Sequence, residues 1–329
     1  MSESTSFATD LQATAPEVPL ALTRAGVTGV QKVIRIAHAG TELVYYADID
    51  CYVDLDPAQK GVHMSRFPET VAEAIDKVVI GEALHVEDLA EHIAAQVVER
   101  QRALRSEVSI RAKFPVTRMT PVSGLPTQEI YHLIGHALVN GAGPRRMVGV
   151  EVRGLNACPC AQGLIRERAA ERLTEAGYDD GQVDEIFRLL PAATHNQRAE
   201  ATLMIGTTRE IDARDLISIA EDAMSAPVFE LLKRPDELFV VEHAHLHPRF
   251  VEDSVRLMVA GAMDRYPDLS DGCFLLARQV NFETIHNHDV LAERHGLVGE
   301  LRADLEGSPD RPRHTTARAW LEGGKKTTA

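Results

Sequence analysis

The sequence has few of the features that mark several large protein classes. Of its 329 residues only four are cysteine and one is tryptophan, and aromatic residues make up 5%. No run approaches the roughly 18 consecutive apolar residues that a membrane helix needs. Residues 1–19 are polar and acidic and lack the apolar core of a secretory signal. We therefore expect a cytoplasmic protein with no membrane partner and with reduced thiols that are free for metal binding or catalysis.

The common nucleotide-binding motifs and an excess of basic residues are missing as well. Neither a G-x-G-x-x-G nor a G-x-x-x-x-G-K-[ST] motif follows a predicted strand, so dinucleotide-binding and P-loop folds have no support. The 35 basic residues are outnumbered by 49 acidic ones, which gives a formal charge of −14. A field of this sign argues against nucleic-acid partners, but a local basic cluster could still hold an anionic small molecule.

The order of the predicted elements indicates an α+β fold. The first set comprises strands at 30–36 and 43–55, helices from about 68 and over 86–103, and strands at 107–116 and 130–139. The turn Asn140-Gly141-Ala142-Gly143 joins the last of these to a strand at 147–155. A second set follows, with strands at 147–155 and 201–207, helices at 213–225 and 249–265, and a strand at 273–281; Asp212 is the expected N-cap of its first helix. Hairpin-joined strands favour an antiparallel sheet.

These sets define the expected domain organisation. Residues 1–24 are expected to form a disordered arm, 25–143 a first unit, 144–298 a second unit, and 299–329 a mostly disordered tail in which Trp320 and Leu321 are candidates for docking. The repeat concerns element order only. A long, helix-rich segment, 161–194, interrupts the second unit.

The sharpest local feature is Cys158-Pro159-Cys160, just past a strand end. Proline cannot continue a central strand, so both thiols are expected on a turn at the edge of the sheet. One thiolate suits zinc or ferrous iron, and the other suits a nucleophile or proton donor. Two reduced cysteines without a role are the alternative interpretation.

Histidines form the second group of candidates. His195 stands just before a predicted strand, where sites are often built, although a structural histidine is the alternative. If the strand at 273–281 continues, His286 and His288 share one face and Glu283 lies close behind. Such a pair could move protons near neutral pH or bind a metal, unless both are solvated loop residues. The denser set at 243, 245 and 247 is explained adequately by a surface turn before Pro248.

The remaining candidates are charged. Glu237 and Glu252 stand at acid-rich helix starts, which are commonplace. His63 is a candidate acid and Arg66 a candidate anion clamp, both between the first strands and the first helix.

Six of these segments, in this order, resemble the prokaryotic type IB GTP cyclohydrolase family and its archaeal, ferrous-iron-dependent branch. They are residues 61–66, 158–160, 195–198, 232–237, 250–253 and 281–289. The resemblance implies a tunnelling fold of two tandem ββααββ-like units with antiparallel sheets and helices on one face. It also implies GTP as substrate and a homotetramer with active sites at subunit interfaces.

Roles follow from the same resemblance. The implied metal ligands are Cys158, His195 and Glu237, which would hold one divalent cation per site, Fe2+, Mn2+ or Zn2+. The implied catalytic residues are Cys160, His286 and His288. Glu252 is implied to anchor guanine, because a carboxylate accepts both the ring N–H and the exocyclic amine. Glu283, His63 and Arg66 complete the expected substrate-binding set.

The implied reaction is hydrolysis of GTP at C8, with release of formate and formation of a 7,8-dihydroneopterin phosphate, the first step of pterin or folate biosynthesis. The product is a triphosphate in one branch and a 2′,3′-cyclic phosphate in the archaeal branch. Two departures from the common pattern are the insert 161–194 and Thr284 in place of serine. The alternatives are a related tunnelling-fold enzyme on another purine or pterin, such as a metal-free nitrile reductase, and a non-catalytic metal-binding protein.

Overall fold

The computed structural model describes residues 10–38, 41–78, 85–307 and 313–323. The strands are β1 (Leu22–His38), β2 (Thr41–Leu55), β3 (Ser106–Met119), β4 (Pro126–Asn140), β5 (Gly143–Ala157), β6 (Asn196–Gly206), β7 (Ala226–Pro227), β8 (Phe274–Asn281) and β9 (Val290–Leu297). The helices are the 3-10 turn η1 (Leu11–Ala13), α1 (Arg66–Val78), α2 (Val86–Gln101), α3 (Pro159–Glu175), α4 (Asp180–Leu189), α5 (Ala213–Asp222), α6 (Arg234–Leu246), α7 (Val251–Arg265), α8 (Val298–Leu305) and α9 (Ala317–Leu321). None of the described helices is long and apolar enough to cross a membrane.

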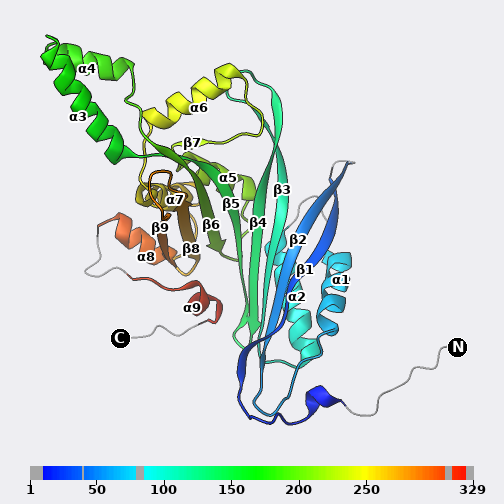
Figure 1. Ribbon diagram of the computed structural model, residues 1–329. Coiled ribbons are helices and arrows are strands. Elements are labelled where there is room, and N and C mark those ends of the chain that lie inside the picture. The colour runs from blue at the N-terminus through cyan, green and yellow to red at the C-terminus, as the bar shows by residue number, and fades with distance from the viewer. Residues whose placement is uncertain (1–9, 39–40, 79–84, 308–312, 324–329) are drawn as a thin grey trace.

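The described strands form one antiparallel sheet in the order β1-β2-β3-β4-β5-β6-β8-β9, with β7 beside β5 (Figure 1). The predicted hairpin between β4 and β5 is confirmed, since Asn140 pairs with Gly143. The Asn140 side chain accepts a hydrogen bond from the N–H of Ala142 at 2.8 Å, and Gly143 has a φ of 100°, which a residue without Cβ adopts freely. This hairpin joins the two predicted sets of strands into a single continuous sheet.

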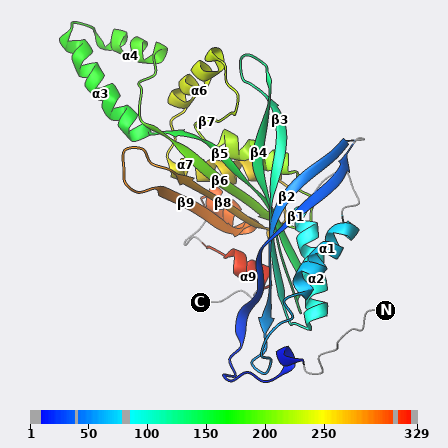
Figure 2. The same ribbon diagram turned by 45° about the vertical axis from the view of Figure 1, so that its right-hand side comes forward.

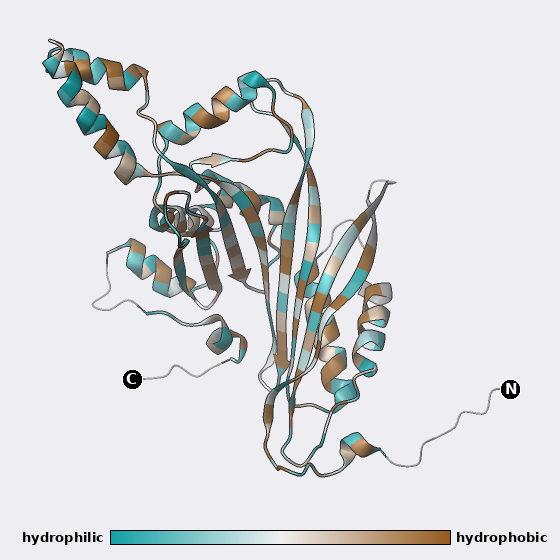
Figure 3. Cartoon of the chain, viewed as in Figure 1, coloured by the Kyte–Doolittle hydropathy of each residue, from teal (hydrophilic) through white to brown (hydrophobic). Residues whose placement is uncertain are grey.

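The main core lies on one face of this sheet. Residues of α1, α2, α5, α7 and α8 pack there against alternate strand residues such as Val108, Ile110 and Val150. Figure 2 shows α1 and α2 beside the strands, and Figure 3 shows hydrophobic and hydrophilic residues alternating along the strands. The period of two that predicted the strands is therefore the pattern that builds the core.

The elements that were not predicted from the sequence include the body of α6 and strand β9. The segment with histidines 243, 245 and 247 was expected to be a surface turn but forms the last turn and the C-cap of α6. Val240 and Ala244 of this helix are buried, whereas Leu238 and Val241 are exposed, so its hydrophobic residues do not mark one clean face. Strand β9 was missed because few of its residues are buried, so apolar and polar residues do not alternate clearly along it. The predicted N-cap Asp212 is confirmed by its bond to the N–H of Arg214.

The two chain ends contain more structure than expected. Strand β1 begins at Leu22, inside the predicted arm, and α8 and α9 lie in the predicted tail. Trp320 is buried against Phe274, and its Nε1 donates to the carbonyl of Gly272 at 2.8 Å. The strand residues in this cluster, Phe274 among them, alternate with residues of the main core, so α9 covers the opposite face. One aromatic side chain thus anchors to the sheet a segment whose composition is typical of a flexible tail.

The insert consists of α3 and α4, which project from the end of the sheet (Figure 1). None of the residues of α3 is buried, and in α4 only Val183 is. The hairpin therefore adds little to the core and leaves the sheet uninterrupted.

Replacing Gly135 by alanine is expected to destabilise the fold. A Cβ at this position of β4 would lie 2.5 Å from the backbone carbonyl carbon and oxygen of Val86, where α2 begins. The backbone cannot yield as a flexible side chain would, so we expect a loss of about 1–3 kcal/mol in the free energy of unfolding. Urea denaturation of Gly135→Ala and of the control Gly141→Ala, whose Cβ would meet open space, measures this. Equal stability of the two variants would show that α2 does not pack closely on β4.

Candidate functional site

The candidate site is built where β5 ends and β6 begins. Ala157 is the last residue of β5 and pairs with Asn196, the first residue of β6. One residue beyond this last pair of the ladder, the N–H of Cys158 donates to the carbonyl of His195 at 3.1 Å. The hydroxyl of Thr194 adds a bond of 3.0 Å to the carbonyl of Cys158. Pairing of the strands thus brings together two residues that are far apart in the sequence.

The cysteines lie at the start of α3. Cys158 is the N-cap, and its Sγ accepts a hydrogen bond from the N–H of Ala161 at 3.5 Å. Pro159 occupies the first helical position, where its missing N–H costs nothing. The prediction that the strand stops before Pro159 is confirmed, but a helix follows instead of a turn. Cys158 is half-buried and Cys160 is exposed.

His195 carries an unsatisfied polar atom. Its Nδ1 is buried and has no hydrogen-bond partner among the described residues. Oε2 of Glu283 lies 3.9 Å from this nitrogen, and Gln197 donates to the other oxygen of that carboxylate at 3.1 Å. A buried nitrogen without a partner is costly, so this atom is suited to a ligand. Histidine nitrogen and cysteine thiolate are both donors that catalytic metal sites use.

Helix α7 begins beside the same strand end. The N–H of Arg249 donates to the carbonyl of Ala157 at 3.0 Å, and the Asn156 amide bonds to Ser254 at 3.1 Å. These contacts place the first turn of α7, with the exposed Glu252, next to the β5–α3 junction.

The two other predicted histidines lie on the loop between β8 and β9. Strand β8 stops at Asn281, so the continuation on which their shared face depended does not occur. The rings of His286 and His288 nevertheless stack, with centroids 5.1 Å apart, and both are exposed. The hydroxyl of Thr284 donates to the carbonyl of Asn196 at 3.2 Å, which ties this loop to the start of β6.

Glu237 is placed differently from the other expected ligands. It is exposed in the first turn of α6, and no described hydrogen bond or ion pair joins it to Cys158 or His195. Its neighbour Asp236 is fully buried and anchors the helix to the β3–β4 loop. The donors to that carboxylate are the N–H groups of Val122, Ser123 and Lys233 and the hydroxyl of Ser123.

His63 and Arg66 lie at the opposite end of the sheet. Both stand near the C-terminal end of α2, where Arg66 donates to the carbonyl of Arg100 at 2.9 Å. The strand register places that end level with Pro144 of β5. Ala157 is thirteen residues further along β5, which at roughly 3.3 Å per residue is about 40 Å. Within one chain, these two residues are not part of the site around Cys158.

Comparison with known proteins identifies the family. The family model described as type I GTP cyclohydrolase folE2 matches residues 8–292. The chain belongs to this type I GTP cyclohydrolase family. Two relatives, each named GTP cyclohydrolase MptA, are 37% identical in Methanosphaera stadtmanae and 40% identical in Methanothermobacter thermautotrophicus. Each alignment covers 90% of this chain, with 97% and 96% of the respective relative.

The fold has a solved counterpart. A hyper-thermostable AgUricase mutant matches with a TM-score of 0.51 over 93% of this chain and 98% of that chain, at 11% identity. At this identity the likeness concerns the fold alone, which is the tunnelling-fold arrangement of the uricases.

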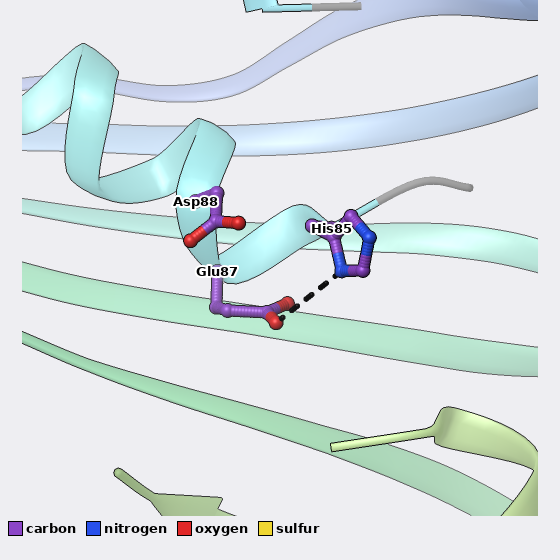
Figure 4. A group of neighbouring side chains, drawn as sticks. All are labelled: His85, Glu87 and Asp88. Carbon is purple, nitrogen blue, oxygen red and sulfur yellow. Dashed lines mark ion pairs between the residues drawn. The ribbon is translucent and has the colours of Figure 1, made fainter. Parts of the chain in front are cut away.

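One further group of metal-ligating side chains lies outside this family's expected site. His85, Glu87 and Asp88 gather at the start of α2, with their ligand atoms within 4.8 Å of one another (Figure 4). Arg146 already binds Asp88 at 2.6 Å, and burial raises the pKa of Glu87. None of the residues implied by the family resemblance belongs to this group, which the contacts explain as an ion-pair network at a helix start.

The three histidines of α6 have two different environments. The rings of His243 and His247, four residues apart, lie 4.2 Å from each other on the outer side of the helix. His245 is buried and faces the segment before His195, since its Nε2 lies 3.2 Å from the carbonyl of Thr194. Sequence reasoning missed this contact because it expected a surface turn, and not a helix, at residues 243–247. The sequence did contain a signal for this helix. Pro235 favours a helix start, and His243 and His247 follow it at a spacing of four residues.

Neutralising Asp236 is expected to destabilise the protein, whereas neutralising Glu237 is not. Burial tends to raise the pKa of Asp236, but the Ser123 hydroxyl and the backbone N–H donors outweigh it and hold the pKa below its ordinary value of 3.8. The charged carboxylate therefore stabilises the fold above about pH 4, and this contribution is lost as the pH falls further. Urea unfolding of Asp236→Asn and Glu237→Gln between pH 3 and 7 tests this. A constant difference between Asp236→Asn and wild type across that range would contradict it.

Proposed function

We propose that the chain is a metal-dependent GTP cyclohydrolase that hydrolyses GTP at C8, releases formate and forms a 7,8-dihydroneopterin phosphate. The observation that carries this proposal is the meeting of Cys158 and His195, with its unsatisfied Nδ1, at one strand end of a chain that belongs to the GTP cyclohydrolase family. Glu252 and the 281–289 loop converge on the same place.

The metal site would use Cys158 and His195 from this strand end and Glu237 from α6. A divalent cation held there supplies Lewis-acid activation of water for attack on guanine. Cysteine, histidine and carboxylate suit Fe2+, Mn2+ and Zn2+. The unsatisfied Nδ1 and the neighbouring thiol support this assignment, and the exposure of Glu237 leaves its carboxylate available.

The other site residues would bind guanine and move protons. Glu252 would accept hydrogen bonds from the ring N–H and the amine of guanine, a bidentate pattern that only a carboxylate completes. Cys160, His286 and His288 are all exposed, which leaves them open to the substrate, and they would donate and accept protons. Glu283, close to His195, would help to orient the substrate.

A complete site would need a second copy of the chain. His63 and Arg66 lie about 40 Å from Cys158 along the strands, so an Arg66 that clamps substrate phosphates has to come from another protomer. We propose a homo-oligomer, a tetramer by the family resemblance, with sites at its interfaces. Each protomer would contribute two tunnelling-fold units, 25–143 and 144–298, whose element order supports the division.

The product we propose is the 2′,3′-cyclic phosphate, which the resemblance to the archaeal branch implies, and the step would open pterin biosynthesis. The two methanogen relatives support this branch over the one that makes the triphosphate.

Anaerobic incubation of the metal-free protein with GTP, adding Fe2+, Mn2+ or Zn2+ in turn, tests the activity. We expect formate and a fluorescent oxidised pterin with at least one metal, and the product mass identifies the phosphate. Glu252→Gln should raise KM for GTP about tenfold or more, because a charged hydrogen-bond acceptor is lost. The exposed Asp264→Asn, on the same helix, is the control. No turnover with any metal, from a folded protein, would refute the proposal.

Mixing two inactive variants tests the shared site. Cys158→Ser and Arg66→Ala should each have little activity alone, since each damages every site. Unfolding and refolding them together should restore activity, because some interfaces then combine an intact Cys158 with an intact Arg66. If the mixture stays as inactive as its components, the two residues do not meet across an interface.

A further inference from the structure

We propose that Gln162 and His245 are positioning residues that hold the segment 192–195, and with it His195, at the distance from Cys158 that a shared cation requires. The inference rests on the metal site of the proposed function and extends it to two residues that do not touch the cation.

Gln162 joins three parts of the chain through one amide group. It lies in the first turn of α3, four residues after Cys158. Its Nε2 donates to the carbonyl of Ala192 at 2.8 Å and to the carbonyl of His245 at 2.7 Å. Both amide hydrogens are therefore used, and α3, the segment 192–195 and α6 are held together.

His245, which lies on α6, contacts the same segment. The residue is 9% exposed, and its Nε2 lies 3.2 Å from the carbonyl of Thr194. Its Nδ1 lies 2.7 Å from the carbonyl of Val241, one turn earlier, which sets the ring orientation. The ring thus spans the gap between the helix and the residue that precedes His195.

Further hydrogen bonds connect the segment 192–195 to Cys158. The Thr194 hydroxyl donates to the Cys158 carbonyl at 3.0 Å, and the Cys158 N–H donates to the His195 carbonyl at 3.1 Å. The His195 ring has no hydrogen bond from its Nδ1, so that nitrogen does not fix the ring, and the backbone of 192–195 sets the point from which the side chain extends. Because α6 also carries Glu237, the same two residues fix the helix that supplies the expected third ligand.

The test measures cation affinity, which a purely structural role would not change in a folded variant. The full chain is loaded with Co2+, whose bond to a thiolate gives a near-ultraviolet charge-transfer absorption, and the metal is withdrawn with a competing chelator. We expect His245→Gln to weaken Co2+ binding about 10- to 100-fold, the usual effect of losing a group that orients a ligand. His247→Gln, on the exposed side of the same helix, should bind Co2+ like wild type.

A second variant tests the same role independently, so that the test does not depend on the folding of the first. Gln162→Met alters only a half-buried side chain at the surface of α3 and should also weaken binding. The double variant should lose less than the product of the two single effects, because both act on one segment. KM for GTP in the metal-saturated variants should stay near the wild-type value.

The outcomes separate the two proposals. A wild type that binds Co2+ through a thiolate, with a His245→Gln variant that binds it equally well, would overturn the positioning role alone. A folded wild type that gives no thiolate absorption would overturn the proposed metal site, and the positioning role with it.

Discussion

The pairing of β5 with β6 is the interaction on which the site depends. Eleven residue pairs connect the two strands, from Met147 opposite Gly206 to Ala157 opposite Asn196. A slip by one residue would turn every side chain of a strand to the other face, so burial of alternate residues fixes the register strongly. The positions of Cys158 and His195, each one residue beyond the ladder, follow directly. An insert of two helices between them does not disturb this, because it leaves the sheet at its end.

Much of the fold could be predicted because it depends on local patterns. Alternating residues indicated the strands, and Asn140-Gly141-Ala142-Gly143 indicated the hairpin that joins them. Helix α6 could not be found in this way, because its buried side rests on Asp236 and His245 as well as on apolar residues. A buried carboxylate held by the N–H groups of a distant loop leaves no periodic signal in the sequence.

The candidate site was predictable in its chemistry but not in its arrangement. Cys158-Pro159-Cys160 and His195 could be singled out because residue type and strand ends are visible in a sequence. Their adjacency depends on the strand register, and the separation of Arg66 from Cys158 depends on the lengths and pairing of the three intervening strands, β3, β4 and β5. Motif order says which groups a reaction uses. It does not say whether one protomer or two supply them.

The docking of Trp320 has a consequence for the chain during its synthesis. Leu138, Met147 and Phe274 form an apolar patch on the face opposite the main core, and Trp320 and Leu321 cover it. Gly206 leaves the space for this ring, since a Cβ there would lie 2.6 Å from it. Trp320 follows Phe274 by 46 residues in the sequence, so during synthesis the patch is made before the side chain that covers it. The patch therefore stays open to solvent, and to other apolar surfaces, until α9 has been made and has docked.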